Sequence, residues 1–434
     1  MLIKIIQFLM SLSLIVIIHE FGHFFFAKLF KCKVEKFYLF FDWKFSLFKR
    51  KLGDTTYGIG WIPLGGYVKI SGMVDESMDK EQLAQEPKPW EYRSKPAWQR
   101  LLIITGGVMM NFILAIMIYI GISWVYGESY ISNKDVSNGY EFTQTAQEVG
   151  FRHGDKIISI DGKVIENSGS LATAILLGDK REVMVERNGT EMLVTIDDAA
   201  VGKLLKEGTS FMIPRHPFII GGIATAQNSE SLAVGDSLVS FNGLNMRYAD
   251  EFKTAFAANS GDSVLLGLVR NTELLEERVL LDSDGKLGVT TIFVNTYPVT
   301  ERHYSFFEAI PQGISMGIDQ LAGYFDQLAL IFSPSTEAYK GVGGFITMGK
   351  IFPDTWDWRY FWSITALLSI MIGALNIMPI PALDGGHLLF IIYEMITGRE
   401  PSQKFMEAAQ TVGFVLIIGL VLLANGNDII KLFN

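Results

Sequence analysis

The chain has 434 residues and a net charge of −9, with 49% hydrophobic and 19% charged residues. This balance excludes an intrinsically disordered chain and a fully water-soluble domain, and it predicts membrane spans joined to globular parts. The single cysteine, Cys32, excludes an intramolecular disulfide, and the lack of a basic stripe interleaved with aromatic residues argues against nucleic acid as a partner.

Apolar segments long enough to cross a bilayer, which takes about 20 helical residues, occur four times. They are residues 5–27, 101–126, 361–384 and 408–427. The first contains His19, Glu20 and His23, and ionisable groups at that depth are costly and usually functional. A cleaved signal peptide would need a small-x-small cleavage site, which is missing, so we predict a retained span.

Lysine and arginine predict which side of the membrane each segment faces. Residues 28–100 hold 14 of them against 9 acidic residues, whereas residues 127–360 hold 19 against 31. Because loops rich in positive charge stay in the cytoplasm, we expect residues 28–100 and the connection 385–407 inside and residues 127–360 outside. Within the first cytoplasmic part, residues 57–73 alternate around a Pro63–Gly66 turn, a pattern typical of a β-hairpin.

A weak duplication lies in the outer part. Residues 154–162 (GDKIISIDG) match residues 235–243 (GDSLVSFNG), each with a Gly-Asp turn, an apolar strand and an Asp/Asn-Gly turn. The pattern resembles tandem bacterial PDZ domains over residues 127–213 and 214–292, whose grooves can take an extended peptide as an added strand. Plain β-rich spacers are the alternative, so peptide ligands are an open expectation.

Residues 293–360 are predicted to form an amphipathic helical linker. Apolar residues recur there at spacings of three and four: Phe306, Phe307, Ile310, Ile314, Ile318, Leu321 and Phe325. Most such stripes are packing faces, so we expect this linker to lie on the membrane or on the spans and to carry no chemistry.

The segment His19-Glu20-Phe21-Gly22-His23 is an HExxH motif inside the first span. Residues four apart share a helix face, so both imidazoles can bind one metal while Glu20 lies beside its water. A buried cluster that only joins helices is the alternative. Three polar groups without a function would, however, be costly to desolvate at this depth.

A catalytic zinc usually has three protein ligands and one open position. The three histidines of residues 127–360 are expected on the far side of the membrane. The other ionisable residues at membrane depth are Asp384 and His387. They are expected at the cytoplasmic side, where the end of the first span also places His19 and His23. Asp384 follows residues 376–381 (NIMPIP), where two prolines break the helix, and broken backbone at this depth is tolerated where it lines a cavity.

These motifs resemble the site-2 protease family (peptidase M50), and within it the bacterial regulator-of-sigma-E protease branch. The resemblance rests on HEFGH, on residues 376–387 (NIMPIPALDGGH) and on the PDZ-like insert, and it covers nearly the whole chain. It implies that His19, His23 and Asp384 bind Zn²⁺ and that Glu20 is the catalytic base. His387 accompanies the LDG motif in this branch. We expect it beside the ligands and not as a fourth ligand, because a hydrolytic zinc needs its open position.

The resemblance also implies how substrate is held. In the family, the hairpin corresponding to residues 57–73 re-enters the membrane, and its edge strand pairs with substrate. The implied contacts are Gly65, Gly66, Tyr67, Val68 and Ile70. Residues 107–111 (GVMMN) resemble a GxxxN motif, although Gly107 stands where the family often has proline. Asn111 and Asn376 are interpreted as groups that bind the substrate backbone, and an interhelical hydrogen bond is the alternative for each.

The sequence thus predicts a polytopic α-helical membrane protein: four transmembrane helices, a membrane re-entrant β-hairpin and two inserted extracytoplasmic PDZ domains. By resemblance, it cleaves single-pass membrane proteins within their spans, near the cytoplasmic side of a bacterial inner membrane. Its substrates would be already shortened proteins such as anti-sigma factors or remnant signal peptides, and the PDZ pair would exclude bulky outer domains. A non-enzymatic PDZ scaffold and a membrane-anchored HExxH protease with a cytoplasmic site remain alternatives. Bound zinc argues against the scaffold, and Asp384 as third ligand favours the intramembrane type.

Overall fold

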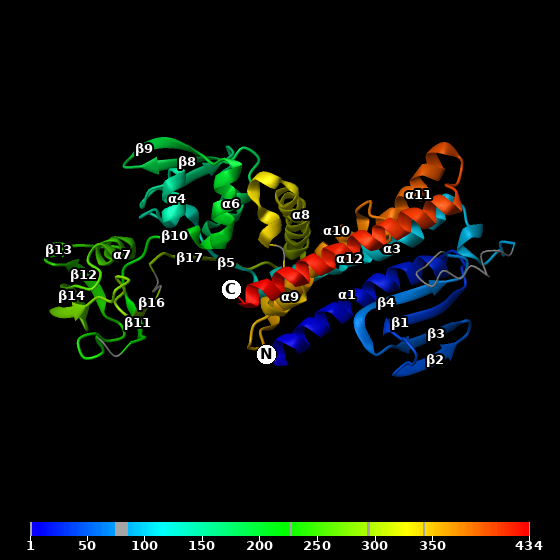
Figure 1. Ribbon diagram of the computed structural model, residues 1–434, viewed down its shortest axis with the longest axis horizontal. Coiled ribbons are helices and arrows are strands. Elements are labelled where there is room, and N and C mark those ends of the chain that lie inside the picture. Colours follow the sequence, from blue (N-terminus) through cyan, green and yellow to red (C-terminus); the bar gives the residue numbers. More distant parts are fainter. Residues whose placement is uncertain (1, 74–85, 226–227, 293–295, 342, 434) are drawn as a thin grey trace. The chain divides into compact units, whose positions relative to one another are not determined.

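The computed structural model describes residues 2–73, 86–225, 228–292, 296–341 and 343–433. The chain divides into two compact units, whose elements are labelled in Figure 1. The first unit combines Met1–Gly127, His303–Ala329 and Tyr339–Asn434, and the second combines Glu128–Arg302 and Leu330–Ala338. The predicted spans therefore belong to the first unit and the duplicated insert to the second.

Four helices among the described residues are long and apolar enough to cross a bilayer. They are α1 (Leu2–Leu29), α3 (Ala97–Tyr126), α10 (Trp358–Ile377) and α12 (Gln403–Phe433). The predicted third span, residues 361–384, is helical only to Ile377, where α10 stops, and α11 (Asp384–Thr397) begins a new helix, so the helix breaks where the sequence predicts it. The two prolines between them explain the break, since proline lacks an N–H and clashes with the preceding turn.

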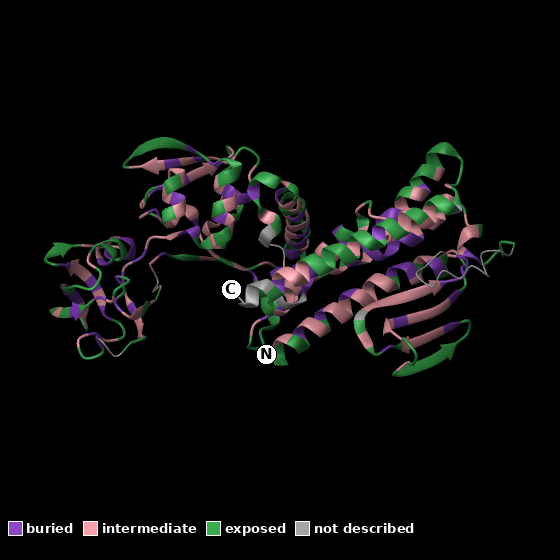
Figure 2. Cartoon of the chain, viewed as in Figure 1, coloured by how far each residue is buried: buried purple, intermediate pink, exposed green. Residues whose placement is uncertain are grey.

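Helix α3 is central to this unit and makes its most extensive helix contacts with α1 and α10. Its buried residues recur at spacings of three and four, as expected for a helix that packs along one stripe. Helix α12, by contrast, buries hardly any of its described residues, most of which are exposed or half-buried (Figure 2). An apolar helix with an exposed surface suits a lipid environment and not water.

Residues 34–70 form a four-stranded sheet where a hairpin was predicted. Its strands are β1 (Val34–Phe41), β2 (Phe48–Leu52), β3 (Thr55–Ile59) and β4 (Ile62–Ile70), in the order β2-β3-β1-β4. Because β1 pairs with both β3 and β4, the last two are not partners. The predicted turn at Pro63–Gly66 is therefore wrong, since these residues lie inside β4. As β4 is an edge strand in this order, it can tolerate a proline, which cannot donate to the ladder.

The second unit consists of two β-rich domains with separate hydrophobic cores. The first domain contains β5 (Glu128–Ile131), β6 (Tyr140–Phe142), α4 (Gln144–Val149), β7 (Lys156–Ile160), α5 (Leu171–Leu177), β8 (Glu182–Arg187), β9 (Thr190–Thr195), α6 (Asp198–Glu207) and β10 (Met212–Pro214). The second contains β11 (Ile220–Ile223), β12 (Ser237–Phe241), β13 (Leu244–Asn245), α7 (Ala249–Ala258), β14 (Ser263–Arg270), β15 (Glu273–Leu280) and β16 (Val289–Thr291). The separate cores agree with two duplicated domains.

A repeated buried ion pair supports the duplication. Asp155 and Asp236 hold the same place in the two copies, and both side chains are fully buried. Asp155 accepts two hydrogen bonds from Arg187, Asp236 accepts two from Arg270, and all four distances are 2.7 Å. Burial alone would raise the pKa of Asp236, but the hydrogen bonds from Arg270 and a backbone N–H hold it below its usual value. The two domains thus share this buried ion pair at equivalent positions of the duplicated sequence.

The predicted helical linker is only partly helical. It contains β17 (Val299–Arg302), α8 (Phe306–Phe332) and α9 (Phe345–Ile351), while its predicted start at residue 293 lies outside the described residues. The helical prediction is wrong at β17, which pairs with β5 from the other end of the insert. This pairing is between segments far apart in the sequence, so local periodicity cannot reveal it. Gly313 of α8 lies against Ile120 of α3, so the amphipathic helix contacts a predicted span.

Candidate metal centre

Three side chains suited to binding a metal converge from two distant segments. His19 and His23 lie on α1, and Asp384 is the first residue of α11. The Nε2 atoms of His19 and His23 lie 3.2 Å and 3.4 Å from Oδ2 of Asp384, and 3.3 Å from each other. Within the described residues, this is the one group of three or more such side chains with closely spaced ligand atoms. The structure therefore brings together the three residues predicted as ligands.

The size of this triangle fits zinc. Zinc bonds of about 2.0–2.1 Å in a tetrahedral site place neighbouring ligand atoms about 3.3 Å apart. Oδ2 of Asp384 is buried and faces the two imidazoles, with no hydrogen bond from any other described group. Two imidazoles and one carboxylate, with a fourth position left for water, are a donor set typical of catalytic zinc. The residues present therefore fit the metal.

A close crossing of α1 and α3 makes room for the imidazoles. A Cβ atom on Gly22 would lie 2.1 Å from the carbonyl oxygen of Gly106, so only glycine allows the two backbones to touch there. A Cβ on Gly107 would lie 2.5 Å from Nε2 of His23 and 2.7 Å from Cε1 of His19. Gly107 of α3 thus leaves the space that both histidine side chains occupy.

Asp384 is positioned by the turn between α10 and α11. Ala382 in this turn has a φ of +83°, a strained value for a residue with a side chain. Gly385 follows Asp384, and a Cβ there would lie 2.0 Å from the carbonyl oxygen of Met378. At the far end of α11, Arg100 of α3 binds Glu394 at 2.5 Å. Both ends of the short helix that begins with Asp384 are therefore held.

Glu20 lies between the two histidines in sequence and beside β4 in space. Its side chain is half-buried, and its Cγ is 3.3 Å from the position that a Cβ on Gly66 would occupy. The same Cβ would lie 2.7 Å from Cγ1 of Val16, so glycine is needed for β4 to approach α1 this closely. The predicted base and the predicted edge strand are therefore neighbours.

Two other predicted residues of β4 have side chains that contact the rest of the sheet. The Tyr67 hydroxyl donates to Asp42 at 2.8 Å, and its ring stacks on Phe41. The side chain of Ile70 is only 2% exposed and belongs to a core with Val34. The side chains of Tyr67 and Ile70 are therefore already engaged inside the chain.

Asn111, Asn376 and His387 are placed differently from one another. The carboxamide of Asn111 is completely buried, with Nδ2 3.3 Å from Nδ1 of His19. Asn376 is half-buried near the end of α10. His387 lies outside the ligand triangle, and its Nε2 accepts a hydrogen bond from Gln410 of α12 at 3.2 Å.

Two contacts near the site were not predicted from the sequence. Gln410 could have been suspected as a polar residue at the start of an apolar span. The backbone carbonyl oxygen of Ile103 accepts a hydrogen bond from Nδ1 of His23 at 2.8 Å. No side-chain pattern can signal a backbone acceptor of this kind.

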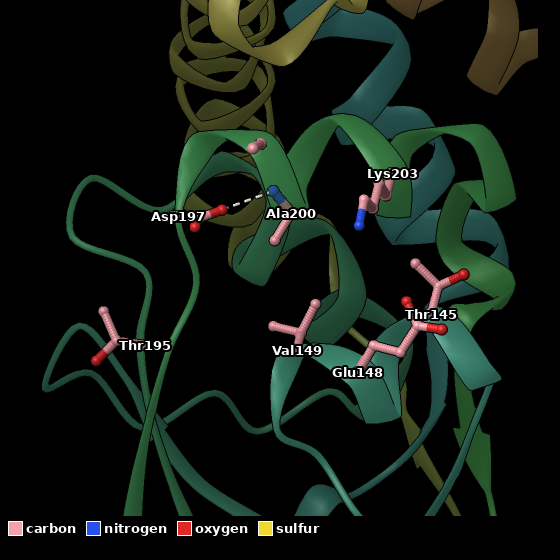
Figure 3. A pocket seen from close by; sticks show the side chains of 8 residues that line it. Thr145, Glu148, Val149, Thr195, Asp197, Ala200 and Lys203 are labelled. Carbon is pink, nitrogen blue, oxygen red and sulfur yellow. Dashed lines mark hydrogen bonds between the residues drawn. The ribbon is translucent and has the colours of Figure 1, made fainter.

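A surface pocket of about 280 Å³ lies in the first β-rich domain (Figure 3). Its lining residues come from α4, β9, α6 and their flanks: Thr145, Glu148, Val149, Thr195, Asp197, Ala199, Ala200 and Lys203. Asp197 caps α6 by accepting a hydrogen bond from the Ala200 N–H at 2.7 Å. The pocket contains none of the predicted site residues, and this polar group in it already has a structural role.

Comparison with known proteins defines the class. The chain belongs to peptidase family M50, whose model matches residues 7–420. It is 28% identical to Protease RseP of Yersinia pestis and 26% identical to the regulator of sigma E protease of Haemophilus influenzae, over 98% of each chain in both cases. Relatives from Rickettsia conorii and Neisseria meningitidis, 28% and 27% identical over at least 99% of each chain, carry names that include zinc metalloprotease.

The chain is therefore a zinc metalloprotease, and these relatives together with the four long apolar helices among its described residues indicate a bacterial membrane protein. The predicted family, enzyme class and metal are confirmed.

Substituting Gly107 tests whether zinc binding needs a residue without a side chain at this position. The family often has proline at the place of Gly107, but the crossing of α1 and α3 in this chain leaves no room for a Cβ there. Gly107→Ala places a methyl group against both imidazoles, so we expect zinc binding to fall sharply. Gly121→Ala is the matched control on the same helix, because a Cβ there has open space. Zinc content of the purified variants, measured by elemental analysis, checks the expectation. Equal zinc content in both would show that the close contact at Gly107 is unimportant.

Proposed function

We propose that the protein hydrolyses peptide bonds inside the membrane spans of single-pass proteins, with Zn²⁺ bound by His19, His23 and Asp384. The observation that carries this proposal is the ligand triangle, built from a 28-residue apolar helix and from the turn that follows another. A scaffold that only binds peptides would not need His19, His23 and Asp384 to lie close together. A cytoplasmic site would need its ligands outside the spans.

Glu20 is the base in this proposal. When bound, zinc lowers the pKa of its water toward about 7 and polarises the carbonyl of the scissile bond. Glu20 accepts the proton of the attacking water and returns it to the leaving nitrogen. His19 and His23 hold the metal from the same helix that carries Glu20, so ligands and base keep a fixed spacing.

Strand β4 would hold the substrate. A membrane span is helical and its carbonyl groups are internally hydrogen-bonded, so it must unwind before hydrolysis. The outer edge of β4 can replace the lost hydrogen bonds with the backbone groups of Gly66, Val68 and Ile70, which alternate with residues that face β1. The approach of Gly66 to Glu20 supports this arrangement, because a strand paired there would pass the base. We further propose that this sheet re-enters the membrane, and that Asn376 contacts the substrate backbone.

The surplus of lysine and arginine in residues 28–100 supports a bacterial inner-membrane location with the site near the cytoplasm. The two β-rich domains would then lie outside, as PDZ domains that exclude substrates with bulky outer parts. Peptides that add a strand to their grooves are further proposed partners.

A deletion tests this exclusion. Ile131 of β5 pairs directly with Val299 of β17, so residues 132–298 can be replaced by a two-residue Asn-Gly turn that closes a hairpin. We expect the shortened enzyme to keep zinc and to cleave a substrate with a large outer domain as fast as a trimmed one. If it still discriminates, or loses activity on both while retaining zinc, the exclusion role is wrong.

The proposed function itself is tested by removing the third ligand. Asp384→Ala is expected to weaken zinc binding by at least about 10²-fold, more than the loss of an orienting group would cost, and to abolish cleavage of a single-pass substrate. Asp284→Ala, at an exposed aspartate of the second β-rich domain, is the control and should change neither. Chelator competition on the purified chain measures the affinity. Parental zinc affinity in Asp384→Ala would refute the ligand set.

A further inference from the structure

We propose that Asn111 holds His19 in the tautomer that binds zinc, so that it is a positioning residue for the metal and not a substrate contact. This inference rests on the proposed ligand set. Its starting point is a strip on α3, where Ile103, Gly107 and Asn111 recur at a spacing of four and share one helix face.

The three residues of this strip contact the two imidazoles one after another, from His23 to His19. Nδ1–H of His23 donates to the carbonyl oxygen of Ile103 at 2.8 Å, which leaves Nε2 of this ring without a proton and ready to bind metal. Gly107 leaves room for both rings. Asn111 then stands 3.3 Å from Nδ1 of His19, in the place where that ring needs the same kind of acceptor.

The carboxamide of Asn111 can supply this acceptor by turning over. In the structure Nδ2 faces the ring, while Oδ1 is buried without a partner among the described residues. The oxygen and nitrogen of a carboxamide exchange places on a half turn, and which one faces a ring is assigned from the hydrogen bonds. Nothing holds Oδ1 where it is, so the turn breaks no bond to the oxygen. Once Oδ1 accepts Nδ1–H of His19, Nε2 is free for zinc.

Burial argues against a substrate contact at Asn111. Its side chain is 0% exposed, whereas Asn376, the other asparagine assigned to substrate, is half-buried. The hydroxyl of the buried Ser369 on α10 donates to the backbone carbonyl of Asn111 at 2.8 Å. This bond fixes the backbone of α3 at the point where the carboxamide meets His19.

Zinc affinity of matched variants tests the inference. Asn111→Leu keeps the size and removes the acceptor, so we expect affinity to fall about 10- to 100-fold, as for other groups that orient a ligand. Asn111→Asp keeps an acceptor and should stay near the parental affinity. Asn376→Leu is the same change at the other asparagine and should leave zinc affinity unchanged. At saturating zinc, we expect Asn111→Leu to show the parental KM.

The outcomes separate the two proposals. Parental zinc affinity with a raised KM in Asn111→Leu would overturn the inference and indicate that Asn111 contacts the substrate. Equal loss of zinc in Asn111→Leu and Asn111→Asp would also overturn it, because a packing role and not an acceptor would then be responsible. His19→Ala must lose zinc in either case. If it does not, the ligand set of the proposed function is wrong.

Discussion

Glu20→Gln is expected to bind zinc as the parent does and to cleave at least about 10²-fold more slowly, the usual scale of general-base catalysis. The amide has nearly the shape of the carboxylate and leaves His19, His23 and Asp384 in place. It cannot accept the proton of the attacking water. The side chain is also half-buried beside Gly66, so the substitution should leave the approach of β4 undisturbed.

Paired measurements of zinc content and cleavage rate check this prediction. Glu308→Gln, an exposed glutamate at the start of α8, is the control and should match the parent in both. A Glu20→Gln enzyme with parental activity would remove Glu20 from the reaction. Loss of zinc in the same variant would instead give Glu20 a role in the metal site.

Val68→Pro is expected to reduce sharply the cleavage of a helical membrane substrate. The N–H of Ser71 donates to the carbonyl of Lys33 at the start of β1, and strand groups alternate in direction, so the N–H of Val68 points to the free edge of β4. Proline removes this donor while the ladder with β1 stays intact. Each main-chain bond to substrate contributes about 0.5–1.5 kcal/mol, and more where water is excluded.

The comparison that decides this prediction uses two substrates and one control variant. Val68→Pro should lower the cleavage rate of a span that contains Gly and Pro less than that of a stable helical span. The former span is already partly unwound and therefore depends less on pairing with β4. Val68→Ala keeps the N–H and should cleave both at nearly the parental rate. If Val68→Pro and Val68→Ala behave alike on both substrates, the edge of β4 does not hold the substrate.

The local chemistry of the site could be predicted from the sequence. HExxH needs only the helical spacing of four to bring His19 and His23 together. The residues alone leave Asp384 and His387 as candidates for the third ligand, and the resemblance to the site-2 protease family implies Asp384. The turn assigned to Pro63–Gly66 failed for a different reason. Alternation within 57–73 resembles a hairpin, but β1, from an earlier segment, lies between β3 and β4.

Contacts between segments far apart could not be predicted in the same way. The contact of Asn111 with His19 depends on where α1 crosses α3, and the pairing of β17 with β5 depends on closure of the whole insert. A motif indicates that a residue has a role. Only the crossing of the helices shows which atom it faces, so the motif of Asn111 leaves both a substrate contact and an interhelical hydrogen bond open.

The position of the cut bond tests the central claim most directly. The purified enzyme and a single-pass substrate are placed together in lipid vesicles, and mass spectrometry locates the new termini with and without a zinc chelator. The account predicts termini inside the apolar span, lost with the chelator and restored by added zinc. Cuts confined to residues outside the apolar span, or cleavage that persists after zinc is removed, would contradict it.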